Sequence, residues 1–190
     1  VYVTKQADGT LKYKSGIICD NYISIDNFDL LSGAGKFATD TNADGLANNI
    51  TAGPAGSYSL SNGIQKFTPT GIWGGIIYNG VPFTIGDIFY GYANVKSNLN
   101  STFFEIGNTN GNPAASANHN GDNTFKFLSG RMTTTALSDI SHGVYVRTSA
   151  ASGWTEIETK DLYMFNLTQM YGSGNEPTQA QMDTIILKSM

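Results

Sequence analysis

The sequence predicts an all-β protein, an antiparallel β-sandwich of the jelly-roll kind that ends in one short helix. Short runs of alternating polar and apolar residues recur from Asn27 onward, with Gly, Asn and Pro turn signals between them. Charged residues make up only 14% of the chain, and 22 glycines fit a fold of short strands joined by many turns. A helical pattern first appears after Pro177.

The chain is expected to divide into three parts. Residues 1–26 contain two alternating runs on either side of Asp8-Gly9, which predicts a β-hairpin that joins the domain to an upstream region. Residues 27–168 form the sandwich. Residues 169–190 close the domain, with a helix at 177–188 that has Ala180, Thr184 and Leu187 along one stripe.

The strands of the sandwich are expected where β-branched and aromatic residues alternate with polar ones. These runs lie at 57–61, 64–69, 73–78, 83–87, 88–96, 101–107, 123–128, 142–148 and 161–167. Between two of them, residues 107–122 are almost all turn formers and predict a long exposed loop.

Charge and composition exclude several classes of partner. The net charge is −4, and the 11 Lys and Arg residues form no basic run that would neutralise phosphates, so a nucleic acid is not expected. No window is long and apolar enough for a membrane span of about 18 residues. A weakly charged surface suits neutral polar ligands such as sugars.

A candidate ligand surface follows from the alternation of two strands. In the 88–96 run, Tyr90, Tyr92, Asn94 and Lys96 fall on the side opposite the apolar residues, and in the 142–148 run Tyr145 and Arg147 do the same. If the two strands are neighbours, they build an aromatic and polar patch to which Glu105 and Tyr78 could add. Exposed tyrosine is also ordinary in β-sheets, so the pattern alone leaves both interpretations open.

The two tryptophans are further candidates for stacking on a sugar ring. Trp73 lies in an apolar run and is expected in the core more readily than at a binding site. Trp154 follows a turn in A-A-S-G-W-T-E, which would place it at a loop rim.

A possible Ca²⁺ loop precedes the first strands. Asp40, Asn42 and Asp44 offer oxygen ligands at alternate positions before Gly45, as in the first half of an EF-hand loop. The bidentate Glu of that motif is absent, because position 51 is Thr51. The alternative is an Asx-rich turn that needs no metal.

Two segments carry a resemblance to a known family. The segment D-L-Y-M-F-N-L-T-Q-M-Y-G-S-G-N-E-P-T at 161–178 resembles the motif that closes jelly-roll domains in tail-associated proteins of phages of Gram-positive bacteria. D-T-N-A-D-G-L-A-N-N at 40–49, followed by Y-S-L-S-N-G-I-Q-K-F-T-P, is similar to the opening of the same domains and of carbohydrate-binding modules. The resemblance covers roughly residues 27–178.

This resemblance implies a non-catalytic domain of a phage tail or fibre that recognises a host cell-surface polysaccharide. It places the protein in the virion, acting at the bacterial surface, with the rest of the tail protein as a partner and a homotrimer as one arrangement. It also implies that an acid of the last strand, Asp161, completes a structural Ca²⁺ site. Related modules often continue with D-G-W, whereas this chain reads Asn48-Asn49-Ile50, which removes one aromatic of a sugar site.

Catalysis has little support in the sequence. A glycoside hydrolase needs two carboxyl groups about 5–10 Å apart, and no pairing among Glu105, Glu156 and Glu158 follows from their spacing. The expected class is therefore not an enzyme. A structural module that decorates or trimerises a fibre is the main alternative, and a jelly-roll hydrolase is the weaker one.

Overall fold

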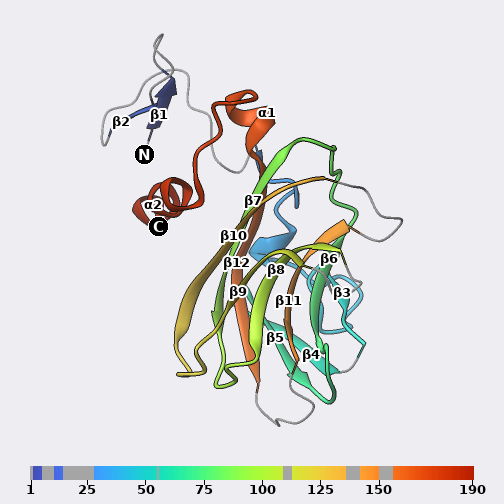
Figure 1. Cartoon of the computed structure of the whole chain (residues 1–190). Coiled ribbons are helices and arrows are strands. Elements are labelled where there is room, and N and C mark those ends of the chain that lie inside the picture. The colour runs from blue at the N-terminus through green and yellow to red at the C-terminus, as the bar shows by residue number, and fades with distance from the viewer. Residues whose placement is uncertain are drawn as a thin grey trace.

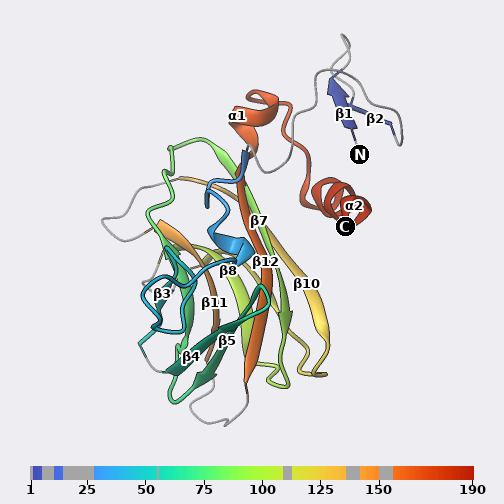
Figure 2. The same ribbon diagram turned by 180° about the vertical axis from the view of Figure 1, so that it is seen from behind.

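The computed structural model describes residues 2–5, 11–14, 28–54, 56–108, 113–135, 142–149 and 156–190. Two antiparallel sheets of five strands each pack face to face, and a separate two-stranded sheet lies near the N-terminus. The predicted all-β sandwich is confirmed. Figures 1 and 2 show the two layers from opposite sides.

One layer, the β11 sheet, has the order β3-β6-β11-β8-β9. Its strands are β3 (Thr51–Ala52), β6 (Gly75–Asn79), β8 (Thr102–Asn108), β9 (Pro113–Asn118) and β11 (His142–Thr148). The other layer, the β12 sheet, has the order β10-β7-β12-β5-β4. Its strands are β4 (Gly56–Ser61), β5 (Ile64–Pro69), β7 (Ile88–Lys96), β10 (Phe125–Thr133) and β12 (Ile157–Asn166).

Alternating apolar side chains from both layers fill the main core. Phe89, Ala93 and Val95 of β7 are fully buried there, as are Val144 and Val146 of β11. The period of two along each strand places these residues on the inner faces, as the sequence predicts. Burying such side chains stabilises the fold by about 1.5–3 kcal/mol for each large one.

A second apolar cluster lies on the outer face of the β12 sheet. Helix α2 (Gln179–Ser189) packs Met182, Ile185 and Ile186 against an aromatic row of that sheet. The predicted helix is therefore present, but its stripe is not the predicted one. Ala180, Thr184 and Leu187 are exposed, because the buried face lies at positions 182, 185 and 186.

A short helix that the sequence analysis missed precedes α2. Helix α1 (Leu167–Tyr171) begins at Asn166, whose side chain accepts a hydrogen bond from the Gln169 N–H at 3.0 Å. This is an ordinary N-cap. A turn of 3₁₀ helix, η2, spans Ala34–Lys36. None of the helices in the described ranges is long and apolar enough to cross a membrane.

The strand predictions miss the two-residue strand β3 and fail in two further places. Residues 113–118 form β9 inside the predicted loop, where Ala115 and Ala117 pack against the core. The alternation of polar and apolar residues in β9 was not recognised, because its small residues Ala, Ser and Asn are also common in turns. The predicted strand at 83–87 is not formed, because a turn at Ile85-Gly86 interrupts it.

The N-terminal part forms β1 (Tyr2–Lys5) and β2 (Leu11–Lys14). The two strands are antiparallel, and Lys5 pairs with Leu11. The expected turn at Asp8-Gly9 lies outside the described residues.

Candidate functional site

The predicted patch is divided between the two sheets. Strand β7, which carries Tyr92 and Asn94, pairs with β10 and β12, whereas β11, which carries Tyr145 and Arg147, pairs with β6 and β8. The two strands are therefore not neighbours in one sheet. Their outward side chains lie on opposite outer faces of the sandwich, so the patch is not a single site.

The tyrosines of β7 are enclosed by other side chains. Tyr90 is fully buried beneath α2, and its hydroxyl donates to Asp183 Oδ1 at 2.7 Å. Tyr92 is only 5% exposed, with its ring between Phe127 at 5.1 Å and Tyr163 at 5.2 Å, centroid to centroid. Neither ring has a free face for a sugar, which corrects their predicted role.

Two other predicted ligand residues, Asn94 and Tyr78, also change their role. Asn94 is buried, and its Nδ2 donates a hydrogen bond to Asp161 Oδ2 at 3.0 Å. The two side chains therefore bond to each other. Tyr78 pairs with the inward residue Val144 and packs against the main core. Trp154 lies outside the described residues.

The remaining predicted residues meet on the outer face of the β11 sheet. Strand register places Tyr145 beside Glu105, and Arg147 beside Phe103. Because residues directly opposite each other in a sheet point to the same face, these four side chains form two adjacent rows. The predicted grouping of Tyr145, Arg147 and Glu105 is present here.

Arg147 lies at the centre of this group. Its Nε donates to Glu105 Oε2 in an ion pair whose side chains are only 8% and 5% exposed. Its guanidinium carbon lies 5.0 Å from the Trp73 ring centroid, 5.1 Å from that of Tyr145 and 5.7 Å from that of Phe103. A guanidinium within about 6 Å of a ring face is in cation–π contact.

Trp73 is the exposed member of the group. It is 41% exposed and meets Phe103 edge-on, with ring centroids 6.1 Å apart. The interpretation of Trp73 as a core residue is therefore wrong, because it lies on the turn that leads into β6 rather than in a strand. Its φ of 64° is in the left-handed region, where a bulky residue is strained. Strain of this kind is concentrated at functional sites.

We call these five residues the Trp73–Arg147 surface; they are Trp73, Phe103, Glu105, Tyr145 and Arg147. Polar side chains border it on the edge strand β9. Ser116 pairs with Glu105 and Asn118 pairs with Phe103, and both β9 residues are exposed. The surface thus combines an exposed aromatic ring with hydrogen-bonding groups at its margin.

Burial also governs the electrostatics of this surface. Desolvation raises the pKa of Tyr145 to about 12, while the Arg147 charge opposes that rise and the Glu105 charge adds to it. The Tyr145 hydroxyl is therefore neutral at physiological pH. Since Arg147 and Glu105 compensate each other, the floor of the surface carries no net charge.

Phe103 is a member of the site that was not predicted from the sequence. The period of two in the 101–107 run places Phe103 on the same side as Glu105, so this residue could have been found. Trp73 could not be assigned in this way, because its turn has no strand periodicity.

The four predicted metal ligands do not come together as one group, because Asp161 is separate from the loop that carries the other three. Within the described residues, no group of three or more His, Cys, Asp or Glu side chains is placed to hold a metal ion. Asp161 lies in a β-bulge of β12 and bonds to Asn94, so it does not complete a site with Asp40 and Asp44. This corrects the four-residue set.

The loop at 40–45 resembles the alternative, an Asx-rich turn. Asp40 Oδ2 accepts from the Gly45 N–H at 2.9 Å, and Asp44 Oδ1 accepts from the Leu46 N–H at 2.8 Å. Asn42 donates to Asp44 Oδ2 at 2.8 Å. Asp40 Oδ1, however, is buried and has no hydrogen-bond partner among the described atoms. A Ca²⁺ ion at this loop stays a prediction, with Asp40, Asn42 and Asp44 as its ligands.

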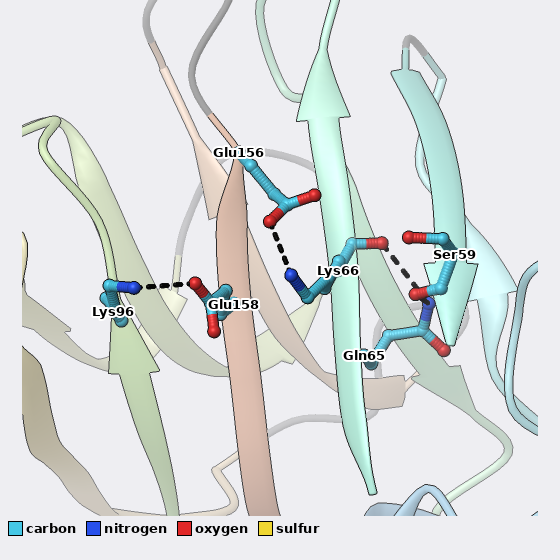
Figure 3. A network of polar contacts seen from close by, with 6 residues as sticks. All are labelled: Ser59, Gln65, Lys66, Lys96, Glu156 and Glu158. Atoms are coloured by element: carbon cyan, nitrogen blue, oxygen red, sulfur yellow. Dashed lines mark hydrogen bonds and ion pairs between the residues drawn. The ribbon is translucent and has the colours of Figure 1, made fainter. Parts of the chain in front are cut away.

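The carboxylates considered for hydrolysis are separated and ion-paired. Glu105 lies on the outer face of the β11 sheet, whereas Glu158 lies on that of the β12 sheet. Figure 3 shows Glu158 beside Lys96 and Glu156 beside Lys66. The N–O distance is 2.7 Å in both ion pairs. Glu105 therefore cannot act with either of the others across one glycosidic bond.

Comparison with known proteins supports the fold. No family model and no curated protein matches the chain. Among solved structures, a family 4 carbohydrate-binding module is similar, with a TM-score of 0.52 and 13% identity, covering 62% of this chain and 94% of the other. The fold is a jelly-roll β-sandwich, similar to the fold of this module.

Two further similar structures are also carbohydrate-binding modules. A xylan-binding family 22 module from Paenibacillus barcinonensis gives a TM-score of 0.46 at 12% identity, covering 65% of this chain and 94% of the other. A family 29 module from Piromyces equi gives a TM-score of 0.43 at 12% identity, covering 64% and 83%.

Proposed function

We propose that this protein is a non-catalytic carbohydrate-binding domain and that its ligand lies on the Trp73–Arg147 surface. One observation carries the proposal: an exposed tryptophan ring is held against a buried arginine–glutamate pair on the outer face of the β11 sheet. The likeness of the fold to carbohydrate-binding modules supports the same class of ligand.

The chemistry of the surface suits a sugar. A pyranose ring has flat C–H faces that stack on an aromatic ring, and its hydroxyl groups need hydrogen-bond partners at the ring margin. Trp73 supplies the ring, and Ser116 and Asn118 supply exposed polar groups on the neighbouring edge strand. A ring that removes apolar area from water contributes more net affinity than hydrogen bonds that replace those made to water.

We also propose a location for the domain, in the virion on a phage tail or fibre. This part rests on the closing motif at 161–178, which resembles that of phage tail domains. The ligand would then be a polysaccharide of the bacterial cell wall, and the rest of the tail protein would be the second partner, in a homotrimer if the fibre is trimeric.

The proposal is tested by removing the Trp73 ring. A glycan array and a pull-down on Gram-positive cell walls would first identify a ligand for the wild type. Trp73→Ala should then weaken binding by about 1–3 kcal/mol, or roughly tenfold to a hundredfold in Kd. Isothermal titration gives both values.

Phe125→Ala is the matched control. Phe125 is 37% exposed, close to the 41% of Trp73, but lies on the opposite sheet beneath Lys160. Its removal should leave the Kd unchanged. Equal losses in both variants would contradict the site, and a wild type that binds no glycan but forms stable trimers would favour the structural alternative.

A further inference from the structure

We infer that Glu105 and Arg147 are positioning residues, which hold the Trp73 ring ready for the ligand without touching the ligand themselves. The inference rests on the proposed function and extends it. It divides the Trp73–Arg147 surface into one exposed contact residue and a buried support.

Burial separates the two roles. The side chains of Arg147 and Glu105 are 8% and 5% exposed, whereas Trp73 is 41% exposed. A ligand that lies on the surface therefore meets the tryptophan first. Phe103 and Tyr145, at 9% and 1% exposed, form the floor around the ion pair.

The support is a chain of contacts that begins at Glu105. The carboxylate accepts from Arg147 Nε, which fixes the plane of the guanidinium. The guanidinium carbon lies over the Trp73 ring, 5.0 Å from its centroid, and Phe103 makes a T-shaped contact with the same ring. Arginine is suited to this position because its planar, charged group can form an ion pair and stack on a ring simultaneously.

The backbone ties Trp73 to the same strand. The Trp73 N–H donates to the Thr148 carbonyl at 2.8 Å, and the Thr148 N–H donates to the Gly74 carbonyl at 3.0 Å. A Cβ at Gly75 would come within 2.6 Å of the Arg147 Cα and Cβ, so only glycine allows this approach. Both the main chain and the ring of Trp73 are therefore fixed by β11.

This arrangement has a consequence for affinity. An exposed tryptophan on a turn would otherwise sample several rotamers, and a ligand would have to immobilise it on binding. A ring that is already held removes part of that entropy loss. Stability alone is a weak reason for the pair, because a buried ion pair is often no more stabilising than apolar side chains of similar volume.

The test begins without a ligand. In a Trp154→Phe background, Trp73 is the remaining one of the 2 tryptophans, so its fluorescence anisotropy and acrylamide quenching report its mobility. Arg147→Lys keeps a positive charge for Glu105 but loses the planar guanidinium that lies over the Trp73 ring. We expect lower anisotropy and stronger quenching of Trp73, and a Kd for the identified glycan that is about two- to tenfold weaker.

Glu105→Gln is the conservative comparison. Its amide oxygen can still accept from Arg147 Nε, so Trp73 should stay as immobile as in the wild type and the Kd should change less than about twofold. A large loss of affinity with unchanged Trp73 fluorescence would show that Glu105 contacts the ligand, and would overturn the inference.

A double variant covers the case in which Arg147→Lys does not fold. Glu105→Leu with Arg147→Met replaces both charges by apolar side chains of similar size, so folding should persist. Trp73 should again become mobile. If its fluorescence stays unchanged in a folded variant, the positioning role is wrong. If instead the wild type binds no glycan, the proposed function fails while the fluorescence still decides the positioning role.

Discussion

Tyr92 and Tyr145 occupy matching positions in their strands, since both point away from the main core. Each was predicted to be a surface ring, yet each is nearly buried. Alternation along a strand predicts the face on which a side chain lies, but not what covers that face. For Tyr92 the cover is a row of aromatic rings, and for Tyr145 it is the group around Arg147.

The burial of Tyr92 changes the expected effect of its removal. Tyr92→Ala should lower the free energy of unfolding by about 3–5 kcal/mol, because a large buried ring leaves a cavity. Phe125→Ala, on the same face but exposed, should change it by less than about 0.5 kcal/mol. Urea unfolding measures both. A Tyr92→Ala protein as stable as the wild type would contradict the stacking described here.

The predicted Ca²⁺ site can also be tested with single substitutions. If the loop at 40–45 binds the ion, the melting temperature should rise with the logarithm of the Ca²⁺ concentration and fall with EDTA. Asp40→Asn should abolish this dependence, since Asp40 Oδ1 is the buried oxygen without a partner.

Asp161→Asn is the control for that experiment. Its carboxylate bonds to Asn94 instead of facing Asp40 and Asp44, so the Ca²⁺ dependence should persist. If the melting temperature of the wild type responds to neither Ca²⁺ nor EDTA, the prediction that the loop at 40–45 binds Ca²⁺ is wrong.

At the scale of elements, the closing motif has a structural explanation. Asn166 donates to Asp87, and Thr168 donates to Glu176 while accepting from the Ile88 N–H, all within 2.9 Å. Thr178 then forms a capping box with Gln181 at the start of α2. The first three bonds connect α1 and the segment that precedes α2 to the start of β7, so the motif fixes this part of the C-terminal region on the sandwich.

The contact between α2 and the β12 sheet should make the fold sensitive to alkali. Burial, and then the hydrogen bond to Asp183, hold the pKa of Tyr90 far above its usual value. Because the pKa of Tyr90 is raised in the folded state, this residue contributes its full share to the free energy of unfolding below about pH 10, which is the pKa of tyrosine in the unfolded chain. That contribution is lost as the pH rises further. The free energy of unfolding should therefore fall above about pH 10.

Tyr90→Phe separates this effect from general alkaline unfolding. The variant should be less stable at pH 8 by about 1 kcal/mol, because Asp183 loses a hydrogen bond. Its stability should then decline less steeply between pH 10 and 11.5 than that of the wild type. Parallel declines in urea unfolding would show that Tyr90 does not contribute.

At the scale of the whole molecule, the sequence predicted the local alternation within strands but not how the strands pair into sheets. Alternation within 88–96 and 142–148 correctly separated core from outer residues. It could not show that β7 and β11 belong to different sheets, because pairing joins residues far apart in the chain. Asp161 was grouped with Asp40 only because the family resemblance implied it, and the face of Trp73 could not be predicted because its turn has no strand periodicity.

The central claim is that the ligand lies on the outer face of the β11 sheet. The most direct measurement is a titration of ¹⁵N-labelled protein with the glycan identified on the array, followed by amide chemical shifts. We expect the amide signals around Trp73 and along β8, β9 and β11 to shift, and those of β4, β5 and β12 to stay unchanged. Shifts confined to the β12 sheet, around Phe125 and Lys160, would contradict it.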